Sequence, residues 1–273
     1  MPLFGLIAVV MINFAANSVL SRAGIYIFDM DPLLFSGIRL ASGAAMLAVL
    51  VSLRGGWPRL DRNRGLTAGA LLIYLVPFSL AYLTLPSGVG ALILFGVVQI
   101  TMFAGSAMAG AHPTRRQWIG MGIAMTGLSW LLLPSQTLAL DGLGVAFMAL
   151  AGVGWGVFSL RGRGSRDPLG DMGISFVALL PMALVLMVLG GGWSLSGVVA
   201  AVICGGVTSG LGYALWYRVL PQIAATTGAV AQLSVPVIAI IAGAILLGEV
   251  ITFDIVMASV VVLGGIGVAV IRR

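Results

Sequence analysis

Charged residues are scarce in this chain, and lysine is missing altogether. Only 8% of the 273 residues are charged, while 60% are hydrophobic. A soluble domain carries about 25% charged residues, so the composition excludes a cytosolic enzyme and an intrinsically disordered chain. A phosphate-binding loop needs a lysine beside its glycines, so ATP-driven transport by this chain alone is excluded as well.

Cysteine and histidine occur once each, as Cys204 and His112. A single cysteine excludes an intramolecular disulfide. The sequence has no Cys/His metal-ligand spacing, no paired-aspartate motif for a diphosphate-bound metal and no nucleophilic serine with a histidine at membrane depth. We therefore expect no metal and no cofactor, and a membrane-embedded enzyme is only a rival interpretation.

The 14 basic residues are all arginines and give the chain a net charge of +6. A nucleic-acid-binding protein gathers such residues on one basic surface. Here they fall mostly in short gaps between apolar runs, where arginines orient membrane helices. We expect a lipid bilayer and a small-molecule substrate as partners, no nucleic acid, and a functional monomer.

Long apolar runs fill the chain. A transmembrane helix needs about 20 apolar residues, and the runs are too long and too uniform for barrel strands. The sequence predicts an all-α polytopic membrane protein of ten transmembrane helices. The predicted spans are 3–21, 32–53, 66–85, 88–109, 117–133, 142–160, 172–189, 197–217, 222–247 and 253–271. Proline and glycine separate them, as at Asp31-Pro32 and Pro86-Ser87-Gly88.

The arginines predict the orientation of these spans. With a cytoplasmic N-terminus, 12 of the 14 arginines lie in inner loops or at the inner C-terminus, while Arg22 lies outside and Arg39 lies inside a span. Basic residues concentrate on the cytoplasmic side, so we expect a multi-pass protein of the bacterial inner membrane with both termini in the cytoplasm. The inner arginines are Arg54, Arg59, Arg62, Arg64, Arg115, Arg116, Arg161, Arg163, Arg166, Arg218, Arg272 and Arg273.

The chain divides into two related halves, residues 1–136 and 137–273. Ala81–Leu85-Pro86 resembles Ala214–Leu220-Pro221, and Gly110-Ala111 and Gly127 fall 138 residues before Gly248-Glu249 and Gly265. Because each half has five spans, the two halves enter the membrane in opposite directions. Inverted repeats place a substrate site at their interface near the midplane. The alternative is chance similarity between two apolar segments.

A specific resemblance is carried by the second half. Trp216-Tyr217-Arg218-Val219-Leu220-Pro221, followed by Ala224-Ala225, Gln232, Pro236, Gly248-Glu249 and Gly264-Gly265, resembles the second half of the EamA family of the drug/metabolite transporter superfamily. Pro32, Arg39-Leu40 and Arg116–Gly120 are similar to its first half. The resemblance implies ten helices, two inverted five-helix repeats and transport of small metabolites or drugs. Aromatic amino-acid exporters are among the similar proteins, although no residue singles them out.

Two departures from the family pattern bear on the substrate. Gly110-Ala111-His112-Pro113 stands where Gly-Glu-Arg is common, and Asn13–Asn17 stands where a Trp-Gly pair is common. The predicted function is therefore an exporter or facilitator of small metabolites such as amino acids, with alternating access around a midplane cavity. The alternative is a proton-coupled exporter of drugs or organic cations.

Few polar side chains are predicted at membrane depth, where an unpartnered polar group costs several kcal/mol. Asn13 and Asn17 share one helix face, and Gln99 and Gln232 lie near the middle of two spans that are repeat partners. We expect these amides to bind substrate, together with three aromatic residues away from the helix ends, Tyr74, Trp155 and Tyr213. Packing between helices is the alternative for each of them.

Structural or gating roles are assigned to Arg39, Pro236 and Glu249. Arg39 could contact an anion, but a structural role is favoured, with the side chain snorkelling outward or bonding Asp29, Asp31 or backbone carbonyls. Pro236 bends the ninth span, and Glu249 either caps the tenth span with Thr252 or pairs with Arg39. Asn13 stands where the small multidrug exporters have a glutamate, and no acid is predicted mid-helix. Passive exchange or facilitated diffusion of a neutral or zwitterionic metabolite is therefore predicted.

Overall fold

The computed structural model describes residues 3–110, 112–133, 140–162, 165–219, 222–223 and 225–270, and within these ranges it contains helices and no strand. Ala111, Arg163, Leu220, Pro221, Ala224, Arg272, Arg273 and the boundary between the halves at residue 136 lie outside them. The helices are α1 (Leu3–Arg22), η1 (Ala23–Ile27), α2 (Pro32–Arg54), α3 (Arg62–Ala81), α4 (Ser87–Met108), α5 (Arg115–Leu132), α6 (Gly142–Gly162), α7 (Pro168–Ala178), α8 (Leu180–Leu189), α9 (Leu195–Val202), η2 (Ile203–Leu211), α10 (Gly212–Val219), α11 (Ala225–Gln232), α12 (Ser234–Leu247) and α13 (Phe253–Val270).

Eight helices of the described residues are long and apolar enough to cross a membrane, and a ninth candidate arises if α7 and α8 form one bent span. The helix in the fifth predicted range, α5, is not among them, since it begins with Arg115 and Arg116 and is the least apolar of the long helices. The third span begins earlier than predicted, at Arg62 rather than 66, because Asp61 caps it by accepting a hydrogen bond from the backbone N–H of Arg64 (2.9 Å).

The other helix starts also follow from local sequence. Asp31 accepts hydrogen bonds from Leu33 and Leu34 at the start of α2, where Pro32 occupies the first helical position. Thr114 and Gln117 form a reciprocal capping box at the start of α5. Gly248 ends α12 with a φ of 67°, a left-handed conformation that favours glycine.

Three predicted spans are interrupted rather than continuous. The seventh bends by 42° between α7 and α8, where Pro181 follows the break. The eighth contains η2, a π-helix of nine residues between α9 and α10. The ninth breaks at Leu233, with Pro236 buried in the first turn of α12. Proline removes a backbone donor and bends a helix, which accounts for the first and third interruptions.

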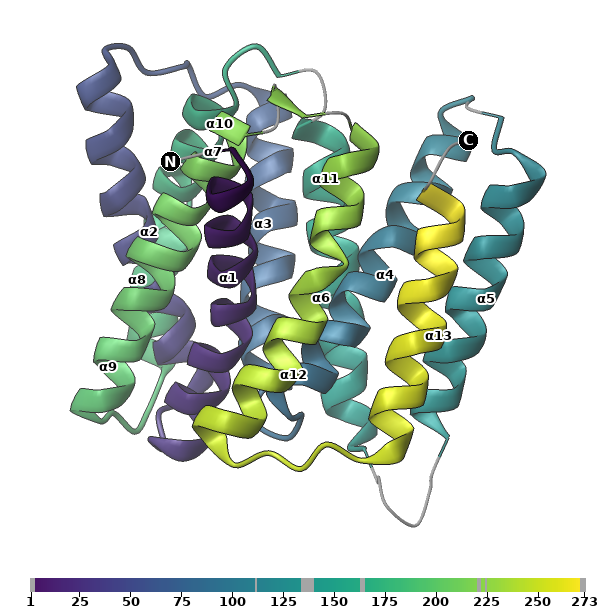
Figure 1. The fold of residues 1–273 in the computed structure, drawn as a ribbon. Helices are drawn as coiled ribbons and strands as arrows, with labels where there is room; N and C mark the ends of the chain where they lie inside the picture. Colours follow the sequence, from purple (N-terminus) through teal and green to yellow (C-terminus); the bar gives the residue numbers. More distant parts are fainter. Residues whose placement is uncertain are drawn as a thin grey trace.

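The helices pack as a bundle with one group at each side and a shared middle (Figure 1). On one side α2 packs against α7, α8, α9 and η2, and on the other side α5 packs against α13. Between them α6 packs against α3 and α4, and α1 packs against α12 and η2. Backbones approach closely at glycines, since a Cβ at Gly120 would overlap the backbone of Gly265 and Ala269.

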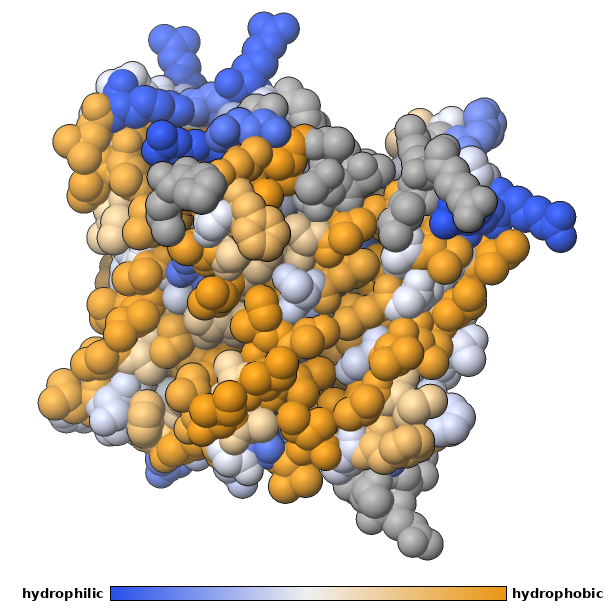
Figure 2. Space-filling model, in the orientation of Figure 1, coloured by the Kyte–Doolittle hydropathy of each residue, from blue (hydrophilic) through white to orange (hydrophobic). Residues whose placement is uncertain are grey.

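The outer surface is apolar over the body of the bundle, and hydrophilic residues gather at the end where α1 begins and α13 ends (Figures 1 and 2). Large apolar side chains such as Val188, Ile245 and Val260 are exposed along this body. A soluble monomer does not expose so continuous an apolar surface. The protein is therefore a multi-pass membrane protein.

Candidate functional site

A small cavity lies in the middle of the bundle, at the meeting point of α1, α3, α4, α6 and α10. Its volume is about 20 Å³, which is room for roughly one water molecule. The lining residues are Phe14, Asn17, Ser18, Tyr74, Phe78, Leu94, Phe95, Trp155 and Tyr213. They come from both halves of the sequence, so the cavity lies between the halves.

Aromatic rings form most of the cavity wall. Trp155 lies at the centre, with its ring 5.1 Å from that of Tyr213 in a stacked arrangement and 5.0 Å from that of Tyr74. Phe14 contacts Tyr213 with ring centroids 5.8 Å apart. Such rings offer flat apolar faces to a planar or aliphatic ligand.

A buried polar cluster adjoins this wall. Arg39 of α2 is completely buried, and its Nη2 donates to Asn17 Oδ1 (3.0 Å), to Tyr74 Oη (3.1 Å) and to Ser209 Oγ (3.3 Å). Its guanidinium carbon also lies 4.9 Å from the ring centroid of Phe78. Three residues that line the cavity, Asn17, Tyr74 and Phe78, are therefore direct neighbours of Arg39.

The π-helix η2 supplies the remaining partners in this cluster. Thr208 and Ser209 both donate to Asn17 Oδ1 at 3.0 Å. Gly205 brings η2 against α2 so closely that a Cβ there would overlap the backbone carbonyl of Arg39. π-Helical turns are rare and occur often at functional sites, and here one brings two hydroxyl groups to the same amide.

Four of the seven predicted substrate-binding residues line the cavity, namely Asn17, Tyr74, Trp155 and Tyr213. Asn13 lies one turn away against Gly212, and its Nδ2 donates to the carbonyl of Val9 (2.9 Å). Gln99 of α4 and Gln232 at the end of α11 are partly buried and are not among the lining residues. The structure thus does not bring the two glutamines together with the other predicted residues at this cavity.

The sequence-based prediction rested on polar side chains at membrane depth and on aromatic residues away from helix ends. It did not include five lining residues: Phe14, Ser18, Phe78, Leu94 and Phe95. Helical spacing could have indicated two of them, because Phe14 lies three residues before Asn17 and Phe78 lies four residues after Tyr74. Leu94 and Phe95 look like any apolar residue of a membrane helix.

The structure also corrects the expected partners of Arg39 and Glu249. Arg39 bonds neither Asp29 nor Asp31 and does not reach the surface. Glu249 pairs with Arg22, at 3.7 Å from its Nε, and accepts hydrogen bonds from the backbone N–H (2.8 Å) and the hydroxyl (2.7 Å) of Ser87. It therefore caps α4, while Thr252 alone caps α13 by accepting from Ile255 N–H (3.3 Å).

A larger vestibule lies at the arginine-rich end, between α3, α6 and α7. Its volume is about 400 Å³, and Arg64, Arg161, Asp171 and Phe158 are among its lining residues. Phe158 also stacks on Trp155, with ring centroids 5.3 Å apart. These two rings therefore stand between the vestibule and the central cavity.

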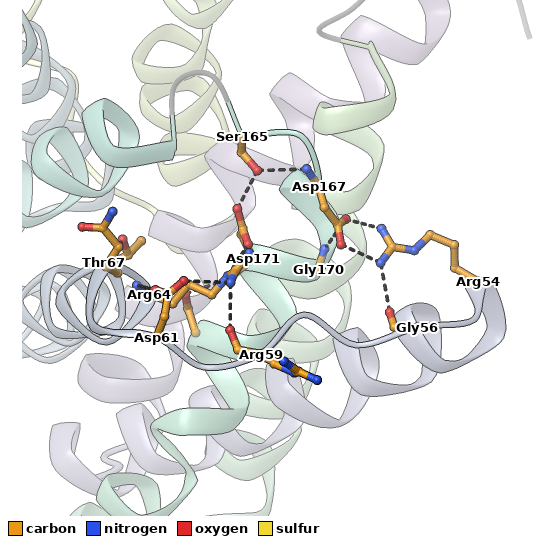
Figure 3. A network of polar contacts seen from close by, with 12 residues as sticks. Arg54, Gly56, Arg59, Asp61, Arg64, Thr67, Ser165, Asp167, Gly170 and Asp171 are labelled. Atoms are coloured by element: carbon orange, nitrogen blue, oxygen red, sulfur yellow. Dashed lines mark hydrogen bonds and ion pairs between the residues drawn. The ribbon is translucent and has the colours of Figure 1, made fainter.

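Ion pairs join the helices around the vestibule (Figure 3). Arg64 Nε lies 2.7 Å from Asp171 Oδ1, and Arg54 Nη2 donates to Asp167 Oδ2 (2.8 Å). The hydrogen bond from Arg54 lowers the pKa of the Asp167 carboxyl, and the backbone N–H of Gly170 adds to the effect. The pairs tie α2 and α3 to the start of α7.

No group of three or more His, Cys, Asp or Glu side chains that could hold a metal ion occurs among the residues that the structure describes. The chemistry available at the central cavity is thus that of a buried guanidinium, an amide, hydroxyls and aromatic faces. Such groups offer hydrogen-bond donors, acceptors and apolar faces to a small molecule.

Comparison with known proteins adds the family. The chain is 41% identical to an uncharacterised protein of Pseudomonas aeruginosa over 96% of its length and 92% of that protein. It is 24% identical to an uncharacterised transporter of Archaeoglobus fulgidus, over 89% of this chain and 90% of the other. A solved crystal structure shares the fold, with a TM-score of 0.67, 17% identity and coverage of 97% and 96% of the two chains. Residues 142–271 match the EamA-like transporter family, and the chain therefore belongs to that family, within the drug/metabolite transporter superfamily.

Proposed function

We propose that the protein carries small metabolites such as amino acids across the bacterial inner membrane, by alternating access around the central cavity. The observation that carries the proposal is the cavity itself, which is lined by helices from both halves of the sequence. Four of its lining residues, Asn17, Tyr74, Trp155 and Tyr213, were predicted from the sequence to bind substrate. A volume of about 20 Å³ is too small for a metabolite. Substrate therefore enters only when the helices separate, as alternating access requires. We infer that one chain suffices, because the cavity is completed within it.

Ten spans in two inverted repeats are part of this proposal. Exchanging the halves preserves the main helix contacts: α3 and α4 pack on α6, while η2, α10 and α12 pack on α1. A Cβ at Gly127 would meet Val262, and a Cβ at Gly265 would meet Ala124. The 138-residue offset converts one contact into the other, as a two-fold relation demands. This reciprocity favours inverted repeats over chance similarity.

We propose a cytoplasmic location for both chain ends. The start of α1 and the end of α13 lie at the same, hydrophilic end of the bundle (Figures 1 and 2). Arg22 was the one arginine predicted on the outer side, and in the structure it is 8% exposed. It pairs with Glu249 and donates to the carbonyls of Tyr82 (2.9 Å) and Leu83 (3.2 Å). Because Arg22 is bonded inside the bundle, we base the proposed orientation on the twelve arginines of the inner loops and C-terminus.

The route through the protein follows from the two cavities. In the proposed cycle, the vestibule is the cytoplasmic entrance, and the stacked pair Phe158–Trp155 is the inner gate. Glu249, Arg22 and Ser87 hold the opposite end of the bundle together. Opening one end while the other stays closed would expose the cavity to one side at a time.

Passive exchange or facilitated diffusion is the proposed coupling. All eight acids belong to the described residues, and none lies in the middle of a helix: Asp254 is the second residue of α13, and Glu249 lies between α12 and α13. A proton-coupled carrier usually relies on a membrane-buried carboxylate. A buried cation beside the cavity also disfavours the alternative of an exporter for organic cations.

Flux into proteoliposomes tests the proposal, with a panel of amino acids, nucleosides and cationic drugs. At substrate concentrations below saturation, Trp155→Ala should reduce flux of the accepted solute by about tenfold, because it removes the central stacking surface. Trp130→Ala is the matched control, because that ring is 52% exposed on the outer surface. Equal flux through both folded variants contradicts the cavity assignment. Uphill accumulation driven by a pH gradient and abolished by a protonophore contradicts passive coupling.

A further inference from the structure

Arg39 is a buried cation without a buried counter-ion. Its side chain has no exposed surface, and its hydrogen-bond partners, Asn17, Tyr74 and Ser209, are all neutral. None of the ion pairs among the described residues includes it. Leaving a charge unpaired in a membrane protein is costly, and such residues commonly face a substrate pathway.

One side of the Arg39 guanidinium also lacks a hydrogen-bond partner. Nε and Nη2 donate to neighbouring side chains, while Nη1 is the one buried side-chain nitrogen or oxygen of the described residues without a partner. A guanidinium presents its N–H groups as a planar fork that matches the two oxygens of a carboxylate. The N–H groups of Nη1 are thus free to donate to a ligand acceptor.

The neighbours of Arg39 place its guanidinium beside the central cavity. Asn17 and Tyr74 bond Arg39 and also line the cavity, as does Phe78, whose ring centroid is 4.9 Å from the guanidinium carbon. The stacked rings of Trp155 and Tyr213 line the same cavity. A molecule with a carboxylate at one end and a planar apolar body at the other would match both features.

We propose that Arg39 binds the carboxylate of the transported solute, and that the rings of Tyr74, Trp155 and Tyr213 hold its apolar body. This inference rests on the proposed transport function and names the substrate class of the same cavity. The cavity of about 20 Å³ must widen before the guanidinium is reached. The carboxylate then supplies the counter-charge that the chain itself does not provide.

The test uses two probes that share a 2-phenylethyl group and differ in the charged group attached to it, 3-phenylpropanoate (carboxylate) and 2-phenylethylamine (ammonium). Binding to purified protein in nanodiscs is measured by calorimetry at pH 7. The wild type should bind the carboxylate at least about tenfold more tightly than the amine. Arg39→Gln should lower the carboxylate affinity by roughly 10- to 100-fold, the loss expected for a charge-assisted hydrogen bond, and Arg39→Lys should retain part of it.

Arg22→Gln is the matched control, because Arg22 is also largely buried but is paired with Glu249, away from the cavity. It should leave the carboxylate-to-amine ratio unchanged even where the melting temperature falls. Equal affinity of the wild type for the two probes overturns the inference, whether or not Arg39→Gln folds. So does an Arg39→Gln protein that binds 3-phenylpropanoate as tightly as the wild type. Selective binding without flux contradicts the transport function alone, and flux of other solutes without carboxylate selectivity contradicts this inference alone.

Discussion

At the scale of single residues, Asn17 is a side chain that joins the two halves of the sequence inside the bundle. Its Oδ1 accepts hydrogen bonds from Arg39, Thr208 and Ser209, and its Nδ2 donates to the carbonyl of Asn13 (3.0 Å). Asn13 has only a bond to its own helix through its side chain. The two asparagines look alike in the sequence, but the structure predicts that they contribute differently to the free energy of unfolding.

Replacing Asn17 by alanine should lower the free energy of unfolding by about 2–3 kcal/mol, because three buried donors each lose one acceptor. Asn13→Ala should cost about 1 kcal/mol or less. The difference is read from melting curves of the purified variants in the same detergent. Equal losses for the two variants would show that Asn17 does not hold the cluster together.

The paired residues Glu249 and Arg22 offer a second prediction at this scale. Glu249→Gln removes the negative charge from the start of α4 and should lower stability by about 1–2 kcal/mol. Arg22→Gln should also destabilise the protein. The double variant should lose about 1 kcal/mol less than the sum of the single losses, since both disrupt one pair. Strict additivity in a double-mutant cycle would contradict the coupling.

At the scale of elements, the link between α2 and the start of α7 is sensitive to pH. The pKa of Asp167 is lowered by the hydrogen bond from Arg54. A carboxyl group with a lowered native pKa stabilises the fold above its unfolded pKa, about 3.9, and that contribution disappears as the pH falls through the native value. The contribution is therefore fully present at pH 5 to 7 and declines below about pH 4.

Comparison of the wild type with Asp167→Asn across this pH range isolates the effect. Because the pair is partly exposed, the difference in unfolding free energy should be only about 0.2–1 kcal/mol at pH 7. It should shrink as the pH falls below about 4. A stability difference that grows on acidification would contradict the proposed ionised pair.

The elements themselves were predictable to different degrees. Long apolar runs located helices in all ten expected ranges, because hydropathy needs no knowledge of neighbours. The π-helical turn in 203–211 was not predictable, since its hydropathy lies between those of the two flanking helices. The partners of Arg39 were not predictable either, because Ser209 lies 170 residues away in the sequence. The aromatic centre was found because Tyr74, Trp155 and Tyr213 stood out from an aliphatic background.

At the scale of the whole molecule, the arginine distribution predicts a single orientation. A reporter that fluoresces only in the cytoplasm, fused after residue 273, should be bright, because the end of α13 lies at the arginine-rich end of the bundle. A fusion to the α12–α13 connection, at the opposite end, should be dark. The reverse pattern in correctly inserted protein would contradict the proposed topology.

The contact between α5 and α13 has a consequence for biosynthesis. α5 carries two arginines at its start and is the least apolar of the long helices, and its glycine face fits directly against the backbone of α13. The ribosome completes α13 only 138 residues after the end of α5 (132 to 270), so α5 remains in the translocon or at the bilayer surface without its partner until then. Completion of the first half thus depends on the last helix to be translated, and nascent chains released before residue 253 should expose α5 to quality-control proteases.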